Sequence, residues 1–233
     1  VVTAIPPDPN LALNPRPFNG SVKVCPDVQL SWTPGISAVK HDIYLGTDFN
    51  DANTAGDPNF PPGRGRQDAN SFVPPELLEY KTTYYWRVDE FDGANITKGL
   101  VWTFNTEDGK AHNPSPADGV SGQVVDVNLC WLPGCLADAH DVYFGTDSYD
   151  VNNATTSEPL SVYKGRRTEN WYDPSTLELD TTYYWRIDEV TDSSVIKGSL
   201  WSFKTSPVRI VAHRIVYGAP DIFCGWPANN GVW

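Results

Sequence analysis

A repeat with an offset of 99 residues constrains this chain more than any other feature. Residues 41–48 (HDIYLGTD) return as residues 140–147 (HDVYFGTD), and residues 82–90 (TTYYWRVDE) return as residues 181–189 (TTYYWRIDE). Self-similarity at one fixed offset marks a duplicated structural unit. The sequence therefore predicts two copies of one domain. The predicted parts are an extended segment at 1–10, domains at 11–106 and 110–205, a short linker at 107–109, and a strand-like tail at 206–233.

Each copy alternates apolar and polar residues with a period of two, which is typical of β-strands. Residues 28–32 (VQLSW) show this alternation, and Tyr84, Trp86 and Val88 fall on one face of a longer strand. The chain has 20 Pro and 18 Gly, which suit many turns, and no segment shows helical periodicity. Several short strands in each copy predict an all-β chain of two antiparallel β-sandwiches in tandem.

Each copy also has a Trp, followed later by a Leu with a Thr and a Tyr at offsets of four and six. These residues are Trp32, Leu78, Thr82 and Tyr84, then Trp131, Leu177, Thr181 and Tyr183. The pattern resembles the fibronectin type III family. The resemblance implies an immunoglobulin-like sandwich in which each Tyr is a tyrosine corner, its hydroxyl bonded to nearby backbone. The residues expected to have structural roles are Trp32, Tyr84, Trp86, Trp131, Tyr183 and Trp185.

Two further resemblances concern the context of the domains. The repeats are similar to modules of large secreted planctomycete-type bacterial proteins, where such modules sit beside carbohydrate-active or lectin-like domains. Residues 223–233 (FCGWPANNGVW) are similar to the start of a sialidase-like β-propeller. This resemblance implies that catalytic residues would come from propeller blades beyond residue 233. We therefore expect the chain itself not to be an enzyme.

Charge, hydrophobicity and cysteine content limit the classes of binding partner and the compartment that we expect for this chain. The formal net charge of −12 argues against a nucleic-acid partner, since phosphate binding needs clustered Lys and Arg. No apolar run approaches the ~20 residues that span a bilayer, so membrane insertion is not expected. Cys130 and Cys135 flank a Pro133-Gly134 turn and are predicted to form a disulfide, which needs an oxidising compartment. Free buried thiols are the alternative.

One repeated loop has closely spaced oxygen ligands. It contains Asp48, Asp51 and Asn53 in the first copy and Asp147, Asp150 and Asn152 in the second. Such a loop suits Ca²⁺, the one cofactor that the sequence leaves open. The alternative is that the same side chains cap the amides of their own turn.

Other polar residues recur without forming a catalytic set. His41 is predicted to be a core-edge histidine, and Asp42 to form an exposed cross-strand ion pair with Arg87. Asp89 and Glu90 are paired carboxylates, but adjacent strand residues point to opposite faces, which argues against a glycosidase pair. The second copy repeats these groups at His140, Asp141, Arg186, Asp188 and Glu189.

Four aromatic residues leave two interpretations open. Tyr85, Tyr184, Trp171 and Tyr172 would form a platform for sugar stacking if they are displayed at the surface. Trp171 stands at the position of Phe72 of the first copy, which indicates a core residue instead. Aromatic side chains are more often buried than displayed, so the core interpretation is preferred.

These observations give one leading hypothesis and two alternatives. The leading one is a non-catalytic structural spacer or scaffold at a cell surface or in a secreted protein, with neighbouring domains or other subunits as partners. The first alternative is a fibre or sheath subunit that lends a terminal strand to a neighbour. The second is a polysaccharide-binding module that accompanies a sialidase-like or other glycoside hydrolase.

Overall fold

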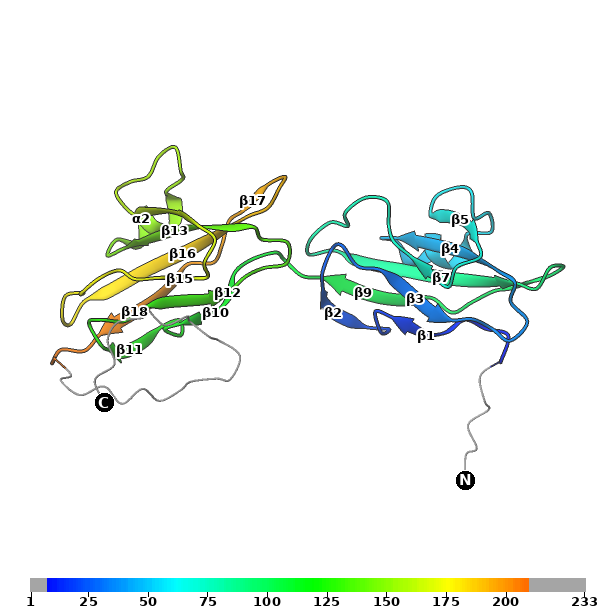
Figure 1. Ribbon diagram of the computed structural model, residues 1–233, viewed down its shortest axis with the longest axis horizontal. Helices are drawn as coiled ribbons and strands as arrows, with labels where there is room; N and C mark the ends of the chain where they lie inside the picture. The colour runs from blue at the N-terminus through cyan, green and yellow to red at the C-terminus, as the bar shows by residue number, and fades with distance from the viewer. Residues whose placement is uncertain (1–7, 210–233) are drawn as a thin grey trace, which may run out of the picture. The chain divides into compact units, whose positions relative to one another are not determined.

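The computed structural model describes residues 8–209, so most of the predicted tail at 206–233 and most of the segment at 1–10 lie outside it. The chain divides into two units, Val1–Asp108 and Gly109–Trp233, and the division falls within the predicted linker at 107–109. Each unit is a β-sandwich with one short helix (Figure 1). The predicted all-β class is confirmed. No helix in residues 8–209 is long and apolar enough to cross a membrane.

The first unit pairs a three-stranded sheet with a larger one. The small sheet has the order β1 (Leu13–Arg16), β3 (Leu30–Thr33), β6 (Ser71–Phe72). The large sheet has the order β2 (Ser21–Val24), β9 (Trp102–Thr106), β7 (Thr83–Phe91), β4 (Lys40–Gly46), β5 (Gly63–Gln67), with β8 (Ile96–Thr97) paired to β7. β2 runs parallel to its neighbour β9, whereas the other strand pairs of this sheet are antiparallel.

The second unit repeats this topology strand for strand. Its small sheet is β10 (His112–Ser115), β12 (Leu129–Leu132), β15 (Trp171–Tyr172). Its large sheet is β11 (Val120–Gln123), β18 (Trp201–Thr205), β16 (Thr182–Val190), β13 (Ala139–Gly145), β14 (Tyr163–Arg167), with β17 (Val195–Ile196) paired to β16.

Tryptophan side chains fill the space between the two sheets. In the first unit the rings of Trp86 and Trp102 lie edge to face with centroids 4.7 Å apart, and Trp32 packs against Trp86 from the small sheet. In the second unit Trp185 and Trp201 repeat the 4.7 Å contact. Edge-to-face aromatic packing is favourable beyond the burial of area alone. The large aromatic residues of the alternating pattern therefore close both sandwiches.

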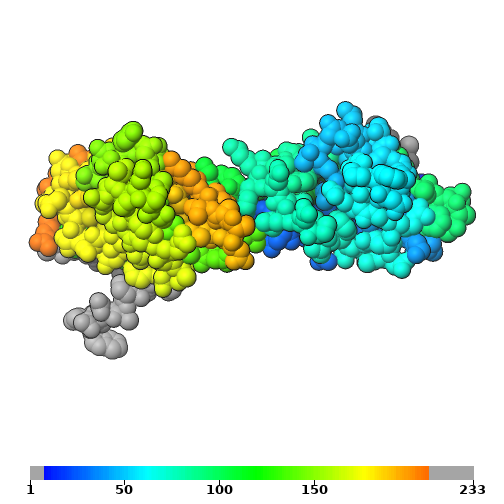
Figure 2. Space-filling model, turned by 90° about the horizontal axis from the view of Figure 1, so that it is seen from above, coloured from blue at the N-terminus to red at the C-terminus, as the bar shows by residue number. Residues whose placement is uncertain are grey.

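A short helix covers the opposite, outward face of each large sheet. These helices are α1 (Phe49–Thr54) and α2 (Ser148–Asn153). Figure 2 shows the segments around α1 and α2 packed over this face of their respective units. Ala52 of α1 and Val151 of α2 are fully buried on the sheet side of their helices. The part of the outward face that belongs to the two central strands of each large sheet is thus a second buried layer, which strand alternation alone does not reveal.

The repeat shifts by one residue between α2 and β15. Phe72 pairs with Leu30 in the first unit, and Tyr172 pairs with Leu129 in the second. Trp171 is therefore the counterpart of Ser71, and its assignment to the position of Phe72 was wrong. The reason is that the loop before β14 is one residue longer in the second unit, so the 99-residue offset becomes 100 there.

Candidate functional site

The most extensive polar cluster of each unit lies on the outward face of the large sheet, under the helix. In the first unit Asp42 of β4 and Asp89 of β7 lie directly opposite each other across the strands. Like charges in such a cross-strand pair repel. Both carboxylates are almost fully buried, so each needs a cation of its own.

Arg66 of β5 provides the cation for Asp42. Its Nε and Nη2 donate to the two carboxylate oxygens of Asp42 at 2.6 and 2.8 Å, a bidentate pair. The guanidinium also lies 4.2 Å from the centre of the Phe91 ring, a cation–π contact. Asp42 is thereby satisfied from the edge strand of the sheet.

Arg87 of β7 provides the cation for Asp89 and holds the helix. Its Nε and Nη2 donate to the Asp89 carboxylate at 2.7 and 2.9 Å. The remaining hydrogens reach the backbone carbonyls of Ala52, Asn53 and Ala55 at the end of α1. The last carbonyls of a helix have no partner within the helix, and basic side chains can satisfy them. Arg87 therefore joins the helix to the sheet.

Burial raises the pKa of Asp89, because the charged carboxylate loses its hydration. The hydrogen bond from Arg87 and the backbone N–H of Gly99, at 2.8 Å, oppose this rise. Gly99 has to be glycine at this close approach, because a Cβ atom there would lie 2.0 Å from the carbonyl oxygen of Val88. The network thus depends on a backbone contact as well as on charge.

The expected Asp42–Arg87 ion pair on an exposed face is therefore wrong. Asp42 pairs with Arg66, Arg87 pairs with Asp89, and neither Asp42 nor Arg87 is exposed. The same correction applies to Asp141 with Arg186. The helix covers this face, so both groups are buried and each has a partner other than the one expected. Arg87 pairs with Asp89, two residues along the same strand, and Asp42 pairs with Arg66 on the next strand. The partner Arg66 was missed because its counterpart, Arg166, recurs at an offset of 100.

The second unit has the same network with one addition. Arg166 binds Asp141 through Nε and Nη2 at 3.0 and 2.8 Å, and the hydroxyl of Tyr163 donates to Asp141 at 2.9 Å. Arg186 binds Asp188 at 2.7 and 2.9 Å and reaches three carbonyls of the α2 segment. Burial raises the pKa of Asp188 as it does that of Asp89.

A histidine–glutamate pair lies on the inward face of each large sheet. In the first unit Nδ1 of His41 bonds to the Glu90 carboxylate, whose other oxygen accepts the Gly35 N–H at 3.2 Å. The Trp32 ring packs edge-on against His41 at 5.3 Å. The second unit repeats the pair with His140, Glu189 and Gly134. His41 and His140 are satisfied buried histidines, as expected, although their partners were not foreseen.

The paired carboxylates diverge as strand alternation requires. Asp89 bonds to Arg87 on the outward face, whereas Glu90 bonds to His41 on the inward face. Asp188 and Glu189 divide in the same way. Two carboxylates on opposite sides of a sheet cannot flank one glycosidic bond.

The loop considered for calcium forms the start of each helix. Asp48 accepts the Asp51 N–H at 3.0 Å, and Asp147 accepts the N–H groups of Tyr149 and Asp150. These are N-cap hydrogen bonds, so both Asp side chains do what the capping interpretation expected. Asn53 and Asn152 contribute backbone carbonyls to Arg87 and Arg186. Within residues 8–209, no group of three or more His, Cys, Asp or Glu is placed to hold a metal.

Both predicted tyrosine corners have the expected hydrogen bond. The hydroxyl of Tyr84 accepts the Glu79 N–H at 2.9 Å, and that of Tyr183 accepts the Glu178 N–H at 3.0 Å. The six Trp and Tyr residues expected to be structural are all buried. The strand order of the sheets together with these corners defines a fibronectin type III-like sandwich in each unit.

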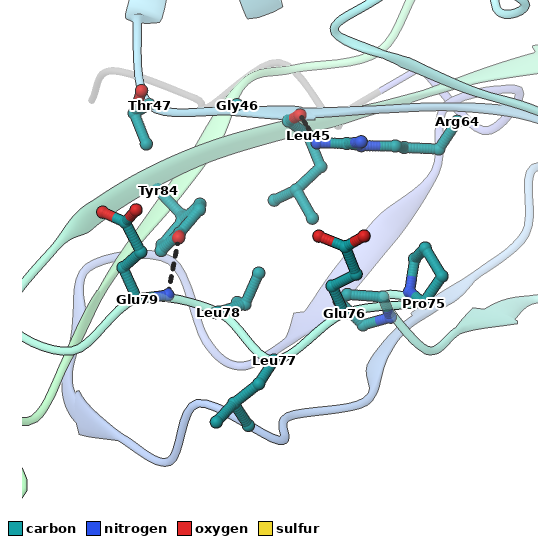
Figure 3. A pocket seen from close by; sticks show the side chains of 11 residues that line it. Leu45, Gly46, Thr47, Arg64, Pro75, Glu76, Leu77, Leu78, Glu79 and Tyr84 are labelled. Carbon is teal, nitrogen blue, oxygen red and sulfur yellow. Dashed lines mark hydrogen bonds between the residues drawn. The ribbon is translucent and has the colours of Figure 1, made fainter. Parts of the chain in front are cut away.

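A pocket of about 510 Å³ adjoins the first corner (Figure 3). The carboxylates of Glu76 and Glu79 point toward the side of Thr47 and Arg64, while Leu77 points away from them. Arg64 donates to the carbonyl oxygen of Leu45 at 3.0 Å on one side of the pocket. The lining of the pocket carries both acidic and basic side chains.

The aromatic residues considered for sugar binding do not come together as a set. Tyr85 packs edge-on against Phe49 of α1 at 5.8 Å, and Tyr184 packs against the small cluster under α2. Tyr172 packs against Phe144 and the second core at 6.1 Å. Trp171 belongs to the outward face of the small sheet and is partly exposed.

The cysteines of residues 8–209 are not free. Cys25, Cys130 and Cys135 are each disulfide-bonded, so the alternative of free buried thiols is wrong for these three. The bond predicted between Cys130 and Cys135 stays a prediction. Cys224 and the rest of the propeller-like string lie outside the described residues.

Comparisons with known proteins add no family. No family model matches the chain, and no curated protein matches it. Solved structures that match include the FN1–FN3 domains of chicken CNTN1, at 8% identity and a TM-score of 0.28, covering 84% of this chain and 67% of that one. A segment of two fibronectin type-III domains from chicken tenascin matches at 14% identity and a TM-score of 0.33, covering 84% of this chain and 98% of the other.

Proposed function

We propose that the two sandwiches are a non-catalytic structural spacer of a bacterial secreted or cell-surface protein. The proposal rests on the contacts that the repeated polar residues make. Each charged or polar group shared by the two networks is used to close its own sandwich or to fasten its own helix. Residues retained for binding a ligand would instead be expected to converge on an open surface.

The disulfides support an extracellular setting. Disulfide bonds persist in oxidising compartments and are rare where thiols are kept reduced. All three cysteines of the described residues are bonded. The negative net charge of −12 favours solubility and argues against adhesion to anionic surfaces. Neighbouring domains of a longer protein are then the proposed partners.

The test is a thermal unfolding series on the full chain, with and without a strong calcium chelator, combined with affinity electrophoresis in polysaccharide gels. We expect the unfolding temperature to stay the same and the mobility to be unaffected by any polysaccharide. A lowered unfolding temperature with chelator would instead indicate a calcium-dependent fold. Retardation in a gel would replace the spacer proposal with the polysaccharide-binding one.

The fibre alternative needs its own measurement. Size-exclusion chromatography with light scattering on the 25.8 kDa chain separates a monomer from a polymer over a range of concentrations. A spacer is expected to remain monomeric. Concentration-dependent polymers would contradict the proposal and favour exchange of terminal strands.

A further inference from the structure

One arginine of the second unit lies outside the ion network described above. Arg167 is the last residue of β14, and Gln67 holds the same place in β5 of the first unit. The side-chain amide of Gln67 donates to the carbonyl oxygens of Ala69 and Ser71, at 2.5 and 2.7 Å. Within residues 8–209, Arg167 forms no hydrogen bond and no ion pair. The donors at this position are therefore satisfied inside the first unit and unused in the second.

The guanidinium of Arg167 is nevertheless held in place. Its Nε is buried without an acceptor, which is unfavourable and uncommon in folded proteins. Its central carbon lies over the Tyr172 ring, 4.9 Å from the ring centre, in a cation–π contact. A charge placed on an edge strand only to discourage pairing with other chains would instead extend into water. Arg167 is thus fixed against its own unit while its hydrogen-bond donors stay unused.

A second unused donor lies beside it. Tyr172 is the counterpart of Phe72, so the hydroxyl has no equivalent in the first unit. Within residues 8–209 this hydroxyl forms no hydrogen bond. Burial raises the pKa of Tyr172, and the Arg167 charge opposes the rise without cancelling it. The hydroxyl therefore keeps its proton at neutral pH and can donate it to an acceptor.

Both donors lie at an open edge of the second sandwich. β14 is the last strand of the large sheet, and β15, which contains Tyr172, is the last strand of the small sheet. Both side chains are partly exposed. An edge strand can also offer its backbone N–H and C=O groups to a further strand. An extended chain that lies along this edge can therefore reach both side chains.

The chemistry of the donors favours a carboxylate. A guanidinium matches the two oxygens of a carboxylate, and the resulting hydrogen bonds are charge-assisted. Four other arginines of this chain bind Asp carboxylates in this way: Arg66, Arg87, Arg166 and Arg186. In Arg167 the covered Nε leaves the two Nη groups as the accessible donors.

The acidic residues nearest in sequence do not supply this carboxylate. Glu169 is exposed and forms no ion pair with Arg167 within the described part of the chain. The Asp173 carboxylate accepts the Ser175 N–H at 2.7 Å instead. The acceptor is therefore expected to come from another molecule.

We propose that the edge formed by Arg167 of β14 and Tyr172 of β15 binds an Asp or Glu side chain from an extended acidic segment of a partner protein. A sugar acid also has a carboxylate, but the guanidinium covers one face of the Tyr172 ring, and the ring packs against Phe144 at 6.1 Å. Little of the ring is left for stacking a sugar. The inference goes beyond the spacer function and can fail without affecting it, because a spacer does not need this contact.

The test is an NMR titration of the full chain with a synthetic peptide that alternates Glu and Thr. We expect saturable shifts of the β14 and β15 backbone amides, and none with a peptide in which Gln replaces Glu. Arg167→Gln should raise the dissociation constant about tenfold or more, because it removes charge-assisted hydrogen bonds. Tyr172→Phe should raise it several-fold. An unchanged dissociation constant in Arg167→Gln, or no shifts at all in the parent chain, would overturn the proposal.

The first unit supplies a matched gain of binding. Gln67→Arg combined with Phe72→Tyr gives that unit the same two donors. The β5 and β6 amides should be unaffected by the peptide in the parent chain and should shift in this double variant. Unaffected β5 and β6 amides in the folded double variant would contradict the assignment of the site to these two side chains.

Thermal unfolding of the same variants separates binding from folding. Arg167→Gln should not lower the unfolding temperature of the free chain, because it removes a buried donor that has no acceptor. A lowered temperature together with weaker binding would assign Arg167 a purely structural role and overturn the proposal. A parallel titration with polygalacturonate, a uronate polymer, tests the other source of carboxylates. Shifts with that polymer that are lost in Arg167→Gln, without shifts from the peptide, would replace the protein partner with a polysaccharide.

Discussion

The two units share a buried ion network but support it differently. Asp42 is held by one arginine, whereas Asp141 is held by an arginine and by the Tyr163 hydroxyl. Under α2, four buried residues form a small apolar cluster: Tyr143, Val151, Ala154 and Val162. Ala52 occupies the position of Val151 in the first unit. The two units therefore share their buried charged residues, whereas the apolar side chains packed around those residues differ.

The largest expected effect comes from removing the arginine that joins helix and sheet. Arg87→Ala and Arg186→Ala each leave a buried carboxylate without its cation and three carbonyls without a donor. Breaking a buried pair in this way costs about 3–5 kcal/mol. Urea unfolding followed by hydrogen-exchange mass spectrometry reads the free energy of each unit separately. Arg64→Ala, which removes one part-buried hydrogen bond to a backbone carbonyl and leaves no carboxylate unpaired, is the control and should cost far less.

A loss of stability in only one of the two variants would contradict the view that both units depend on the same arginine. If Arg87→Ala destabilised its unit while Arg186→Ala did not, the apolar cluster under α2 would be holding that helix without the arginine. The shared network would then not be the common structural requirement.

The next effect is alkaline unfolding of the second unit. Burial raises the pKa of Tyr143 to about 12, with the Asp188 and Asp141 charges adding to the rise. An unfolded tyrosine ionises near pH 10, so the unfolded state loses its proton first. The stability from this group is complete below pH 10 and declines as the pH rises toward 12. Tyr143→Phe should flatten that decline, measured by tyrosinate absorbance and circular dichroism.

Tyr44→Phe gives the matched measurement in the first unit. Burial also raises the pKa of Tyr44, so its replacement should flatten the alkaline decline of that unit. An alkaline decline that persists unchanged in Tyr143→Phe would show that other groups govern it.

A smaller loss of stability is expected from the hydrogen bond that only the second network has. Tyr163→Phe removes one hydrogen bond to the buried Asp141 carboxylate and should cost about 1.5–3 kcal/mol. Gly63 begins β5 and is the counterpart of Tyr163, which begins β14. Gly63→Tyr should not stabilise the first unit, because a Cβ atom at Gly63 would lie 2.5 Å from the Pro58 backbone. Urea unfolding of both variants checks this asymmetry. A stabilising Gly63→Tyr would mean that the first unit accepts the same support.

The smallest change in unfolding free energy is expected from an exposed ion pair. Lys40 and Asp68 form an ion pair at 3.0 Å, and both side chains are largely exposed. Such pairs contribute about 0–1 kcal/mol and weaken in salt. Lys40→Ala should therefore shift the urea midpoint of the first unit only slightly, and less in high salt. A shift as large as that of Arg87→Ala would contradict the distinction drawn between buried and exposed charges.

Much of the fold was predictable because it depends on local pattern. Strand alternation placed Trp86 and Val88 on the inward face, and the spacing of Leu78 and Tyr84 predicted the corner that the Glu79 N–H completes. The arginine partners were harder to predict. Arg66 and Asp42 are distant in sequence, and their pairing depends on the bulged register between β4 and β5. Trp171 was misplaced because a single inserted residue changes the offset between the copies.

The sequence by itself determined the duplication, the all-β class, the two corners and the divergence of Asp89 from Glu90, because these follow from repeat spacing and from the two-residue period of a strand. Only the tertiary structure decided that the outward face is buried at the two central strands of each large sheet. A helix six residues long, carried over that face by a loop, removes Asp42 and Arg87 from water. Burial depends on what the rest of the chain places above a strand, and a strand's own sequence does not contain that information.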